Sequence, residues 1–175
     1  MMSDDVAAGE EIWFDAFNTM RASHGLPVDQ RSPEMIARTR SRIARLLATD
    51  PGGSWVAEGD DGRVVGLTQA LVREDLWVLS MLGVAPGCQE RGTGKALLDV
   101  ALAYGEKTPA GMSLSSQDPR AMRRYTQAGF DLHPCVAADG LVDGRGVGLA
   151  GAVREGGPAD LGLVADLGRR LRGGP

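Results

Sequence analysis

The fold is decided by residues 76–105, LWVLSMLGVAPGCQERGTGKALLDVALAYG. The first part, Leu76–Val84, is a short apolar run bounded by polar and turn-forming residues, and this pattern predicts a buried strand. The last part, Lys95–Tyr104, places apolar residues at helical spacing along one face and predicts an amphipathic helix. A glycine-bearing loop joins the two, so the stretch predicts strand, loop and helix in that order.

This loop has the features of a phosphate site. Free backbone N–H groups and the positive end of the helix dipole converge at a helix N-terminus. Gly92 and Gly94 allow a ligand to approach where a Cβ atom would collide with it. A Walker A loop is excluded because Gln89 stands at its first glycine position and Ala96 at its hydroxyl position. A Rossmann fingerprint is excluded because Leu97 occupies the place of its third glycine.

The pattern that remains is Q/R-x-x-G-x-G/A after a strand that ends in V-x-P. It is met by Val84-Ala85-Pro86 together with Gln89, Gly92 and Gly94, and it resembles the acetyl-CoA pyrophosphate loop of the GNAT superfamily of N-acetyltransferases. A second segment of that family, N-x-x-A-x-x-x-Y-x-x-x-G-F, is matched in register, with the aspartate in place of the asparagine, by Asp118, Ala121, Tyr125, Gly129 and Phe130. The departure is mild, because both residue types cap helices.

The resemblance implies an α/β fold with a mixed, mostly antiparallel sheet, a central parallel βαβ crossover and helices on both faces. Hydrophobic patterns and turn signals support it by predicting an antiparallel meander that leads into a right-handed crossover. The expected helices are 11–23, 33–48, 95–104 and 118–129, and the expected strands are 54–58, 64–72, 76–84 and 111–116. In the family, the first two helices and their connection cover the acceptor pocket. The arginines of helix 33–48 are expected on its solvated side, with a basic docking face as the alternative.

The predicted domains are 1–137, the acetyltransferase domain, and 138–175, a glycine-rich tail. The family usually opens with a strand, for which Met1–Glu10 offers little apolar material. The tail contains a strand pattern at Val147–Gly156 and then a helix pattern, which resembles the beginning of a second, truncated module. We expect its strand to fill the vacant position, within its own molecule or in a homodimer by strand exchange. The alternative is a loosely attached tail.

Composition excludes several classes of protein. A net charge of −4 provides no global basic footprint for nucleic acid. The acidic N-terminus lacks a signal peptide, and no apolar run approaches the ~18 residues of a membrane span. Cys88 and Cys135 are too few for a disulfide framework and favour reduced thiols in the cytoplasm. His24 and His133 lack ligand-like spacing, so no metal site is expected.

The resemblance implies direct transfer of an acetyl group from acetyl-CoA to a primary amine, on a small molecule or a peptide, in a ternary complex. Main-chain amides of the loop are expected to bind the diphosphate, with Arg91 and Lys95 as charge partners. Residues of the central strand would pair with the pantetheine arm, and a backbone N–H there would stabilise the carbonyl oxygen. The predicted coenzyme-binding residues are Leu82, Val84, Gln89, Glu90, Arg91, Gly92, Thr93, Gly94 and Lys95.

Three residues are candidates for catalysis. Tyr125 matches the tyrosine of the family, and a phenol of pKa about 10 is protonated at neutral pH and can protonate a thiolate. The alternative is a tyrosine that only packs between helix and sheet. Glu58 is a candidate base and Ser80 a water-holding group, with surface solvation as the alternative for the glutamate. A non-catalytic CoA-binding or regulatory module and an ATP- and magnesium-dependent protein remain alternatives, and the sequence does not identify the acceptor.

Overall fold

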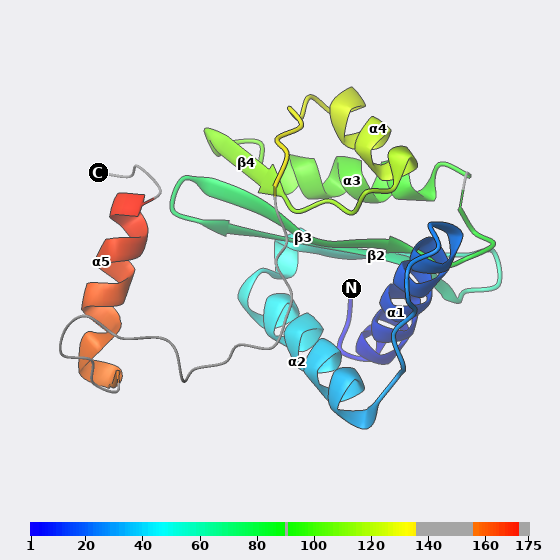
Figure 1. The fold of residues 1–175 in the computed structure, drawn as a ribbon, viewed down its shortest axis with the longest axis horizontal. Helices are drawn as coiled ribbons and strands as arrows, with labels where there is room; N and C mark the ends of the chain where they lie inside the picture. The colour runs from blue at the N-terminus through cyan, green and yellow to red at the C-terminus, as the bar shows by residue number, and fades with distance from the viewer. Residues whose placement is uncertain (90, 136–155, 172–175) are drawn as a thin grey trace. The chain divides into compact units, whose positions relative to one another are not determined.

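The computed structural model describes residues 1–89, 91–135 and 156–171 (Figure 1). The chain divides into two compact units, Met1–Leu132 and His133–Pro175. In the second unit the structure describes the short helix η3 (Pro158–Asp160) and α5 (Leu161–Leu171), where a helix was predicted. Most of the predicted tail strand lies outside the described residues, so its pairing and the second-module hypothesis stay predictions.

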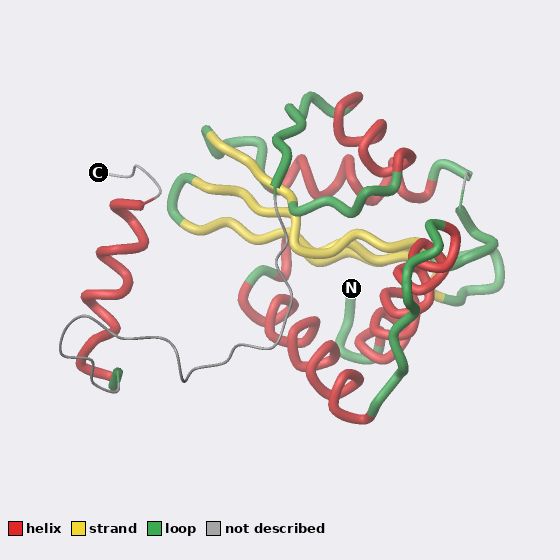
Figure 2. The backbone as a smooth tube through the Cα atoms, in the orientation of Figure 1, coloured by secondary structure: helices red, strands yellow, loops and turns green. Residues whose placement is uncertain are grey.

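The first unit is built on a four-stranded sheet in the order β1-β2-β3-β4 (Figure 2). Both pairs among the first three strands are antiparallel, whereas β3 and β4 are parallel and joined through helix α3 (Thr93–Tyr104). The predicted mixed sheet with a parallel crossover is therefore confirmed. The strands are β1 (Ser54–Glu58), β2 (Val64–Arg73), β3 (Leu76–Val84) and β4 (Ala110–Ser113). The last of these ends at Ser113, short of the predicted Ser116.

Helices cover both faces of this sheet, as expected. Figure 1 shows α3 and α4 (Pro119–Gln127) on one face and α1 (Asp5–Ser23) and α2 (Pro33–Thr49) on the other. The predicted starts of two helices are confirmed by their caps. The Ser32 hydroxyl accepts from the N–H of Met35 at 3.2 Å, and the Asp118 carboxylate accepts from the N–H of Arg120 at 2.9 Å.

The first helix begins earlier than predicted. Asp5 lies in its first turn, and Val6–Glu10, which the sequence assigned to no element, is helical. This happens because Met1 and Val6 pack against the core between α1 and the sheet, where a strand would place alternate residues in solvent. Within the described residues no strand precedes α1, so the place of the family's first strand is not filled from this segment.

Strand β3 contains a bulge. Gln69 of β2 pairs with Met81, but the next residue, Ala70, pairs with Leu79, so Ser80 has no partner on β2. A bulge of one residue inverts the alternation of side chains along a strand. The resemblance to the GNAT superfamily implies a bulge around Met81–Val84, and the structure places it at Ser80, one residue before that range.

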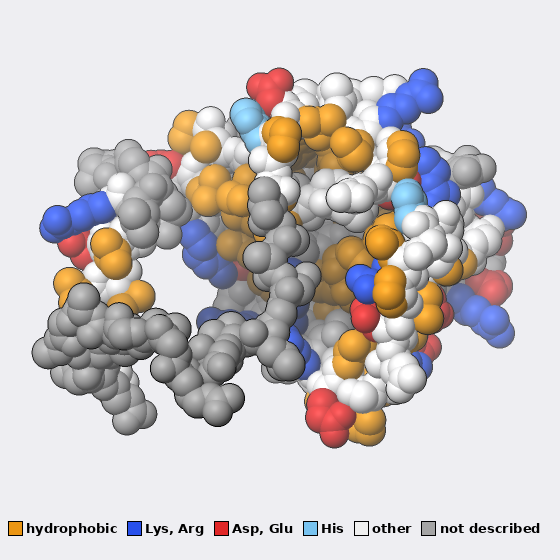
Figure 3. All heavy atoms as spheres, in the orientation of Figure 1, with side chains coloured by type: hydrophobic (Ala, Val, Ile, Leu, Met, Phe, Trp, Pro, Cys, Tyr) orange, Lys and Arg blue, Asp and Glu red, His pale blue; other side chains and the backbone are white. Residues whose placement is uncertain are grey.

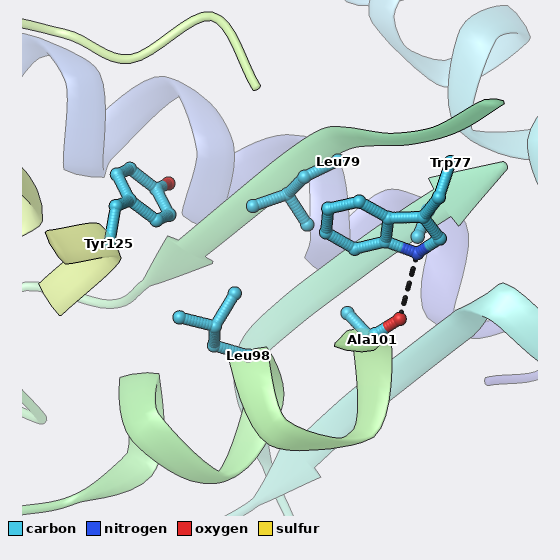
Figure 4. Close-up of a cluster of buried hydrophobic side chains, with 6 residues drawn as sticks. Trp77, Leu79, Leu98, Ala101 and Tyr125 are labelled. Atoms are coloured by element: carbon cyan, nitrogen blue, oxygen red, sulfur yellow. Dashed lines mark hydrogen bonds between the residues drawn. The ribbon is translucent and has the colours of Figure 1, made fainter. Parts of the chain in front are cut away.

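Because of this inversion, the buried side chains of the two halves of β3 pack in different hydrophobic cores. Before the bulge, Trp77 and Leu79 pack on the α3 face, where the Trp77 indole N–H donates to the carbonyl of Ala101 at 2.9 Å (Figure 4). After it, Met81 packs on the opposite face with residues of α1, α2 and β2. The backbone is therefore kinked where the two cores meet.

A buried carboxylate ties α2, β2 and α3 together away from this kink. Asp50 is 2% exposed, and its two oxygens accept from the Arg73 guanidinium at 2.7 and 2.8 Å. The hydroxyls of Thr49 and Tyr104 donate to it at 2.6 and 3.3 Å. These hydrogen bonds, that of Arg73 above all, lower the pKa of Asp50 to about 2. Burial and the nearby Asp50 carboxylate raise the pKa of Tyr104.

Candidate active site

A cavity opens where β3 loses β4 as its neighbour. The parallel pairing ends at Leu79 and Ser113, directly before the bulge. Beyond that point lies a cavity of about 580 Å³, bounded by residues 79–84 of β3, residues 113–116 and parts of α1, α4 and the glycine loop. The remainder of β3 on this side has no strand partner among the described residues. Its edge therefore presents main-chain groups to an extended ligand, as strand-addition sites do.

The glycine loop forms one end of the cavity. Gly92 is the N-cap of α3 in a left-handed conformation, φ 86°, which favours glycine. Its carbonyl accepts from the N–H groups of Lys95 and Ala96 at 2.9 and 3.0 Å, so the Lys95 amide is not available to a ligand. In the described part of the chain, no protein acceptor is recorded for the N–H groups of Gly92, Thr93 and Gly94. At a helix N-terminus, N–H groups that no described residue accepts from form a site for an anion.

The charged partners of this loop differ from those predicted. Lys95 forms an ion pair with Asp99 at 2.5 Å on the surface, and neither Lys95 nor Arg91 lines the cavity. The cation that does line it beside the loop is Arg120 of α4, whose guanidinium donates to Gln89 Oε1 at 3.2 Å. Arg120 was not among the residues predicted to bind the coenzyme. Glu90, predicted to bind the coenzyme, lies outside the described residues.

The remaining predicted contacts of the coenzyme are found along the cavity. Leu82 and Val84 line it from the part of β3 that has lost β4, and Gln89, Gly92 and Gly94 line it from the loop. The Gln89 side-chain amide donates to the carbonyl of Val84 at 3.2 Å, which fastens the loop to the end of the strand. Thr93, in contrast, is not among the lining residues.

Tyr125 lies in the same cavity. The side chain is 8% exposed, and its ring stands edge-on to Phe130 with centroids 5.7 Å apart. Figure 4 shows the ring across from Leu79 of β3 and Leu98 of α3. Burial raises the pKa of the phenol, an effect that a hydrogen bond with the Ser113 side chain partly opposes. The phenol is therefore protonated at neutral pH, as an acid for a leaving thiolate must be.

Ser80, the bulge residue, also lines the cavity. Its carbonyl and its hydroxyl oxygen both accept from the guanidinium of Arg42 on α2 at 2.8 Å. Arg42 is exposed, as predicted for the arginines of this helix, yet it also holds the bulge. Because the Ser80 hydroxyl accepts from Arg42, its own hydrogen remains to be donated to a water molecule or a substrate.

The structure does not bring Glu58 to this site. Glu58 is exposed at the end of β1, opposite Val64, and is not among the residues that line the cavity. The one carboxylate among the described lining residues is Asp118, which pairs with Arg120 at 2.9 Å. The described cavity wall therefore contains no unpaired carboxylate that could act as a base.

Helix α1, one of the two helices that the resemblance places over the acceptor pocket, contributes to the wall of the cavity. Trp13, Ala16, Phe17 and Met20 line the cavity, and the rings of Trp13 and Phe17 lie 4.2 Å apart. Hydrophobic side chains are visible in the hollow between α4 and α1 (Figure 3). The i, i+3, i+4, i+7 spacing of these residues is also that of a core-facing stripe, so the sequence carries no signal that separates the two uses.

Comparison with known proteins agrees with this geometry. The model of the acetyltransferase (GNAT) family matches residues 13–130, which include β3, the loop, α3 and α4. The chain belongs to the acetyltransferase (GNAT) family. The predicted co-substrate, acetyl-CoA, is the acetyl donor of this family. The family model ends at Phe130, before the tail.

Two relatives of the chain are named mycothiol acetyltransferase. That of Clavibacter michiganensis is 30% identical over 102 residues, which are 58% of this chain and 33% of the relative. That of Streptomyces avermitilis is 35% identical over 89 residues, which are 48% of this chain and 29% of the relative. The matched part of the chain thus spans about a third of the length of these relatives.

Solved structures support the fold. The PaiA N-acetyltransferase of Thermoplasma acidophilum, solved in complex with coenzyme A, has a TM-score of 0.58 at 14% identity, covering 76% of this chain and 87% of that one. At this identity the likeness concerns the fold alone. Among the described residues, no helix is both long and apolar enough to cross a membrane.

Proposed function

We propose that this chain moves an acetyl group from acetyl-CoA to a primary amine, directly and within a ternary complex. The observation that carries the proposal is the cavity at the β3 bulge. It joins the N–H groups at the α3 N-terminus, an edge of β3 without a strand partner among the described residues, and a buried, protonated Tyr125. Diphosphate, pantetheine and thioester need these three features in this order along one ligand.

Each feature has a role in the proposal. The N–H groups of Gly92 and Gly94 bind the diphosphate, and Arg120 adds positive charge beside them. The free edge of β3 aligns the pantetheine arm along Leu82 and Val84, which positions the reacting carbon. As the carbon–nitrogen bond forms and the carbon–sulfur bond breaks, the phenol of Tyr125 gives its proton to the departing sulfur.

The acceptor amine must lose a proton as it reacts. Because the described wall offers no unpaired carboxylate, we assign this step to a water molecule held by the Ser80 hydroxyl, which Arg42 orients. Water then carries the proton out of the cavity. Glu58 has no place in this proposal, because it does not line the cavity.

A non-catalytic CoA-binding module is the second candidate, and the lack of an unpaired carboxylate in the described wall favours it. Both candidates predict that acetyl-CoA raises the melting temperature of the protein, because a ligand that binds the native state stabilises it. They differ in turnover. The module binds acetyl-CoA and releases no thiol with any acceptor.

The experiment measures thiol release from acetyl-CoA over a panel of primary amines that carry no thiol of their own. Melting temperatures are recorded with acetyl-CoA and with ATP and magnesium. Amine-dependent thiol release with an acetylated product supports the proposal. Stabilisation by acetyl-CoA without release favours the binding module, and stabilisation by ATP alone overturns both.

A further inference from the structure

The cavity passes through the sheet from one face to the other. Its wall includes Tyr125, which packs on the α3 face, and Trp13, which packs on the α1 face against the core that contains Met81. The passage is open because β3 and β4 separate at the bulge. A ligand anchored at the glycine loop and reaching Tyr125 occupies the α3 side. The second substrate must then approach its reactive end from the α1 side.

The wall on the α1 side is apolar. Trp13, Phe17 and Met20 lie at spacings of four and three residues, so they project from one side of α1. All three are partly buried, and a Cβ at Gly83 of β3 would lie 3.7 Å from the Trp13 ring, so the indole packs closely over the strand. All the residues that α1 contributes to the lining, these three and Ala16, are apolar.

The carboxylates of α1 do not reach this wall. Glu10 is buried about one turn before Trp13, where Arg31 and Arg40 pair with it at 2.7 and 3.3 Å, and it is not among the lining residues. Glu11 and Asp15 are exposed and are not among the lining residues. An acceptor that approaches along α1 therefore meets no negative charge from this helix.

The charged lining residues make the cavity positive. They are Arg120, Arg123 and Arg124 with the single carboxylate of Asp118, which Arg120 already pairs. A cavity with this balance favours anions and repels additional positive charge. An acceptor with several ammonium groups would have to leave water for an apolar wall next to three guanidinium groups, which carries a high desolvation cost.

We infer that the acceptor is a monoamine whose amino group sits next to an aromatic or bulky apolar group, and that this group packs on Trp13, Phe17 and Met20. The inference rests on the proposed acetyl transfer and specifies its acceptor class. Polycationic amines are disfavoured by the same wall, both by its lack of carboxylates and by the positive lining. Specificity of this kind combines attraction for one ligand with rejection of another.

The first test compares four amines at saturating acetyl-CoA: 2-phenylethylamine, tryptamine, ethylamine and spermidine. An apolar group that fills part of a pocket typically changes kcat/KM by about 10- to 200-fold. We expect both aromatic amines to exceed ethylamine by at least about tenfold, and spermidine to fall at or below ethylamine. Spermidine at or above 2-phenylethylamine, or no difference between 2-phenylethylamine and ethylamine, overturns the inference.

A charge substitution tests the wall itself. Met20→Glu places a carboxylate among the apolar lining residues, and Thr19→Glu places the same charge on the adjacent, exposed position that does not line the cavity. We expect Met20→Glu to lower kcat/KM for 2-phenylethylamine at least about tenfold and to raise the relative rate with spermidine. Thr19→Glu should leave kcat/KM for 2-phenylethylamine and the relative rate with spermidine within about twofold of wild type. Equal effects of the two variants overturn the assignment of this wall to the acceptor.

The outcomes separate this inference from the function on which it rests. If spermidine is acetylated best, acetyl transfer stands and only the acceptor class is wrong. If no amine on the panel is acetylated, acetyl transfer to amines fails. In that case, calorimetric titration of 2-phenylethylamine and spermidine into the protein–CoA complex tests the assignment of the wall independently of turnover. Tighter binding of spermidine than of 2-phenylethylamine, or no binding of either amine, contradicts the assignment.

Discussion

Replacing Tyr125 with phenylalanine removes one oxygen atom from the cavity and leaves the ring that packs against Phe130. The free energy of unfolding should fall by about 0.5–1.5 kcal/mol, the usual contribution of one hydrogen bond, here the one with Ser113. For a chain of this size the melting temperature then falls by no more than about 5 °C. The fold and the coenzyme site are otherwise unaltered.

Turnover should respond far more strongly. A positioned general acid contributes about 10²- to 10⁴-fold, or about 3–5 kcal/mol of activation free energy. We expect kcat of Tyr125→Phe to fall by that factor while the dissociation constant of acetyl-CoA stays within about threefold of wild type. Because burial raises the pKa of Tyr125 above its ordinary value, the acid should not limit kcat of the wild type below a pH of about 10.

The second tyrosine of the chain is a matched control. Tyr104 lies outside the cavity, also has a raised pKa, and donates to Asp50. Tyr104→Phe should cost a similar free energy of unfolding and leave kcat within about twofold. Stopped-flow thiol release gives the chemical step and calorimetry gives the affinity for acetyl-CoA. A kcat for Tyr125→Phe within about threefold of wild type from pH 6 to pH 9 would refute the role of Tyr125 as the acid.

The other predictions concern the loop, the bulge and the buried carboxylate. Gly92→Ala and Gly87→Ala each introduce a Cβ at a φ of 86° and should each cost about 1–2 kcal/mol, but only the first should weaken acetyl-CoA binding, measured by calorimetry. Arg42→Gln should lower kcat/KM at least about tenfold because it loosens the bulge, while Arg45→Gln on the exposed surface should not change it. Because the Asp50 pKa is lowered to about 2, the carboxylate contributes stability that is present above its unfolded-state pKa of about 4 and is lost as pH falls towards 2. Asp50→Asn should reduce the loss of unfolding free energy between pH 6 and pH 2 by about 1–2 kcal/mol, measured by urea denaturation. An unchanged pH dependence would contradict the role of Asp50.

The order of strands and helices was accessible from the sequence because local signals determine it. Proline at the first position of α4, preceded by Asp118, and the glycine-bearing start of α3 each satisfy a local hydrogen-bonding need, and both were found where predicted. The start of α1 was missed. Val6–Glu10 is short and weakly apolar, and only packing against the finished sheet determines its conformation.

The candidate site was predictable only in part. The loop glycines and Tyr125 were found because their spacing along the chain is regular. The resemblance placed the first two helices over the acceptor pocket, but it did not identify the residues of α1 that form the wall, because a stripe such as Trp13 and Phe17 has the same pattern whether it covers a core or a cavity. The contact of Arg42 with Ser80 joins residues distant in the chain, and no local pattern reports it.

The bulge of β3 makes the length of this strand matter as much as its composition. If Ser80 were deleted, β3 would pair with β2 without a bulge. The side chains of one half of β3 would then point to the opposite face of the sheet, and the two cores could not both keep their present side chains. Substitutions at Ser80 leave the spacing of its neighbours intact, whereas a deletion there changes it. Homologues that keep this sheet should therefore seldom lack a residue at this position.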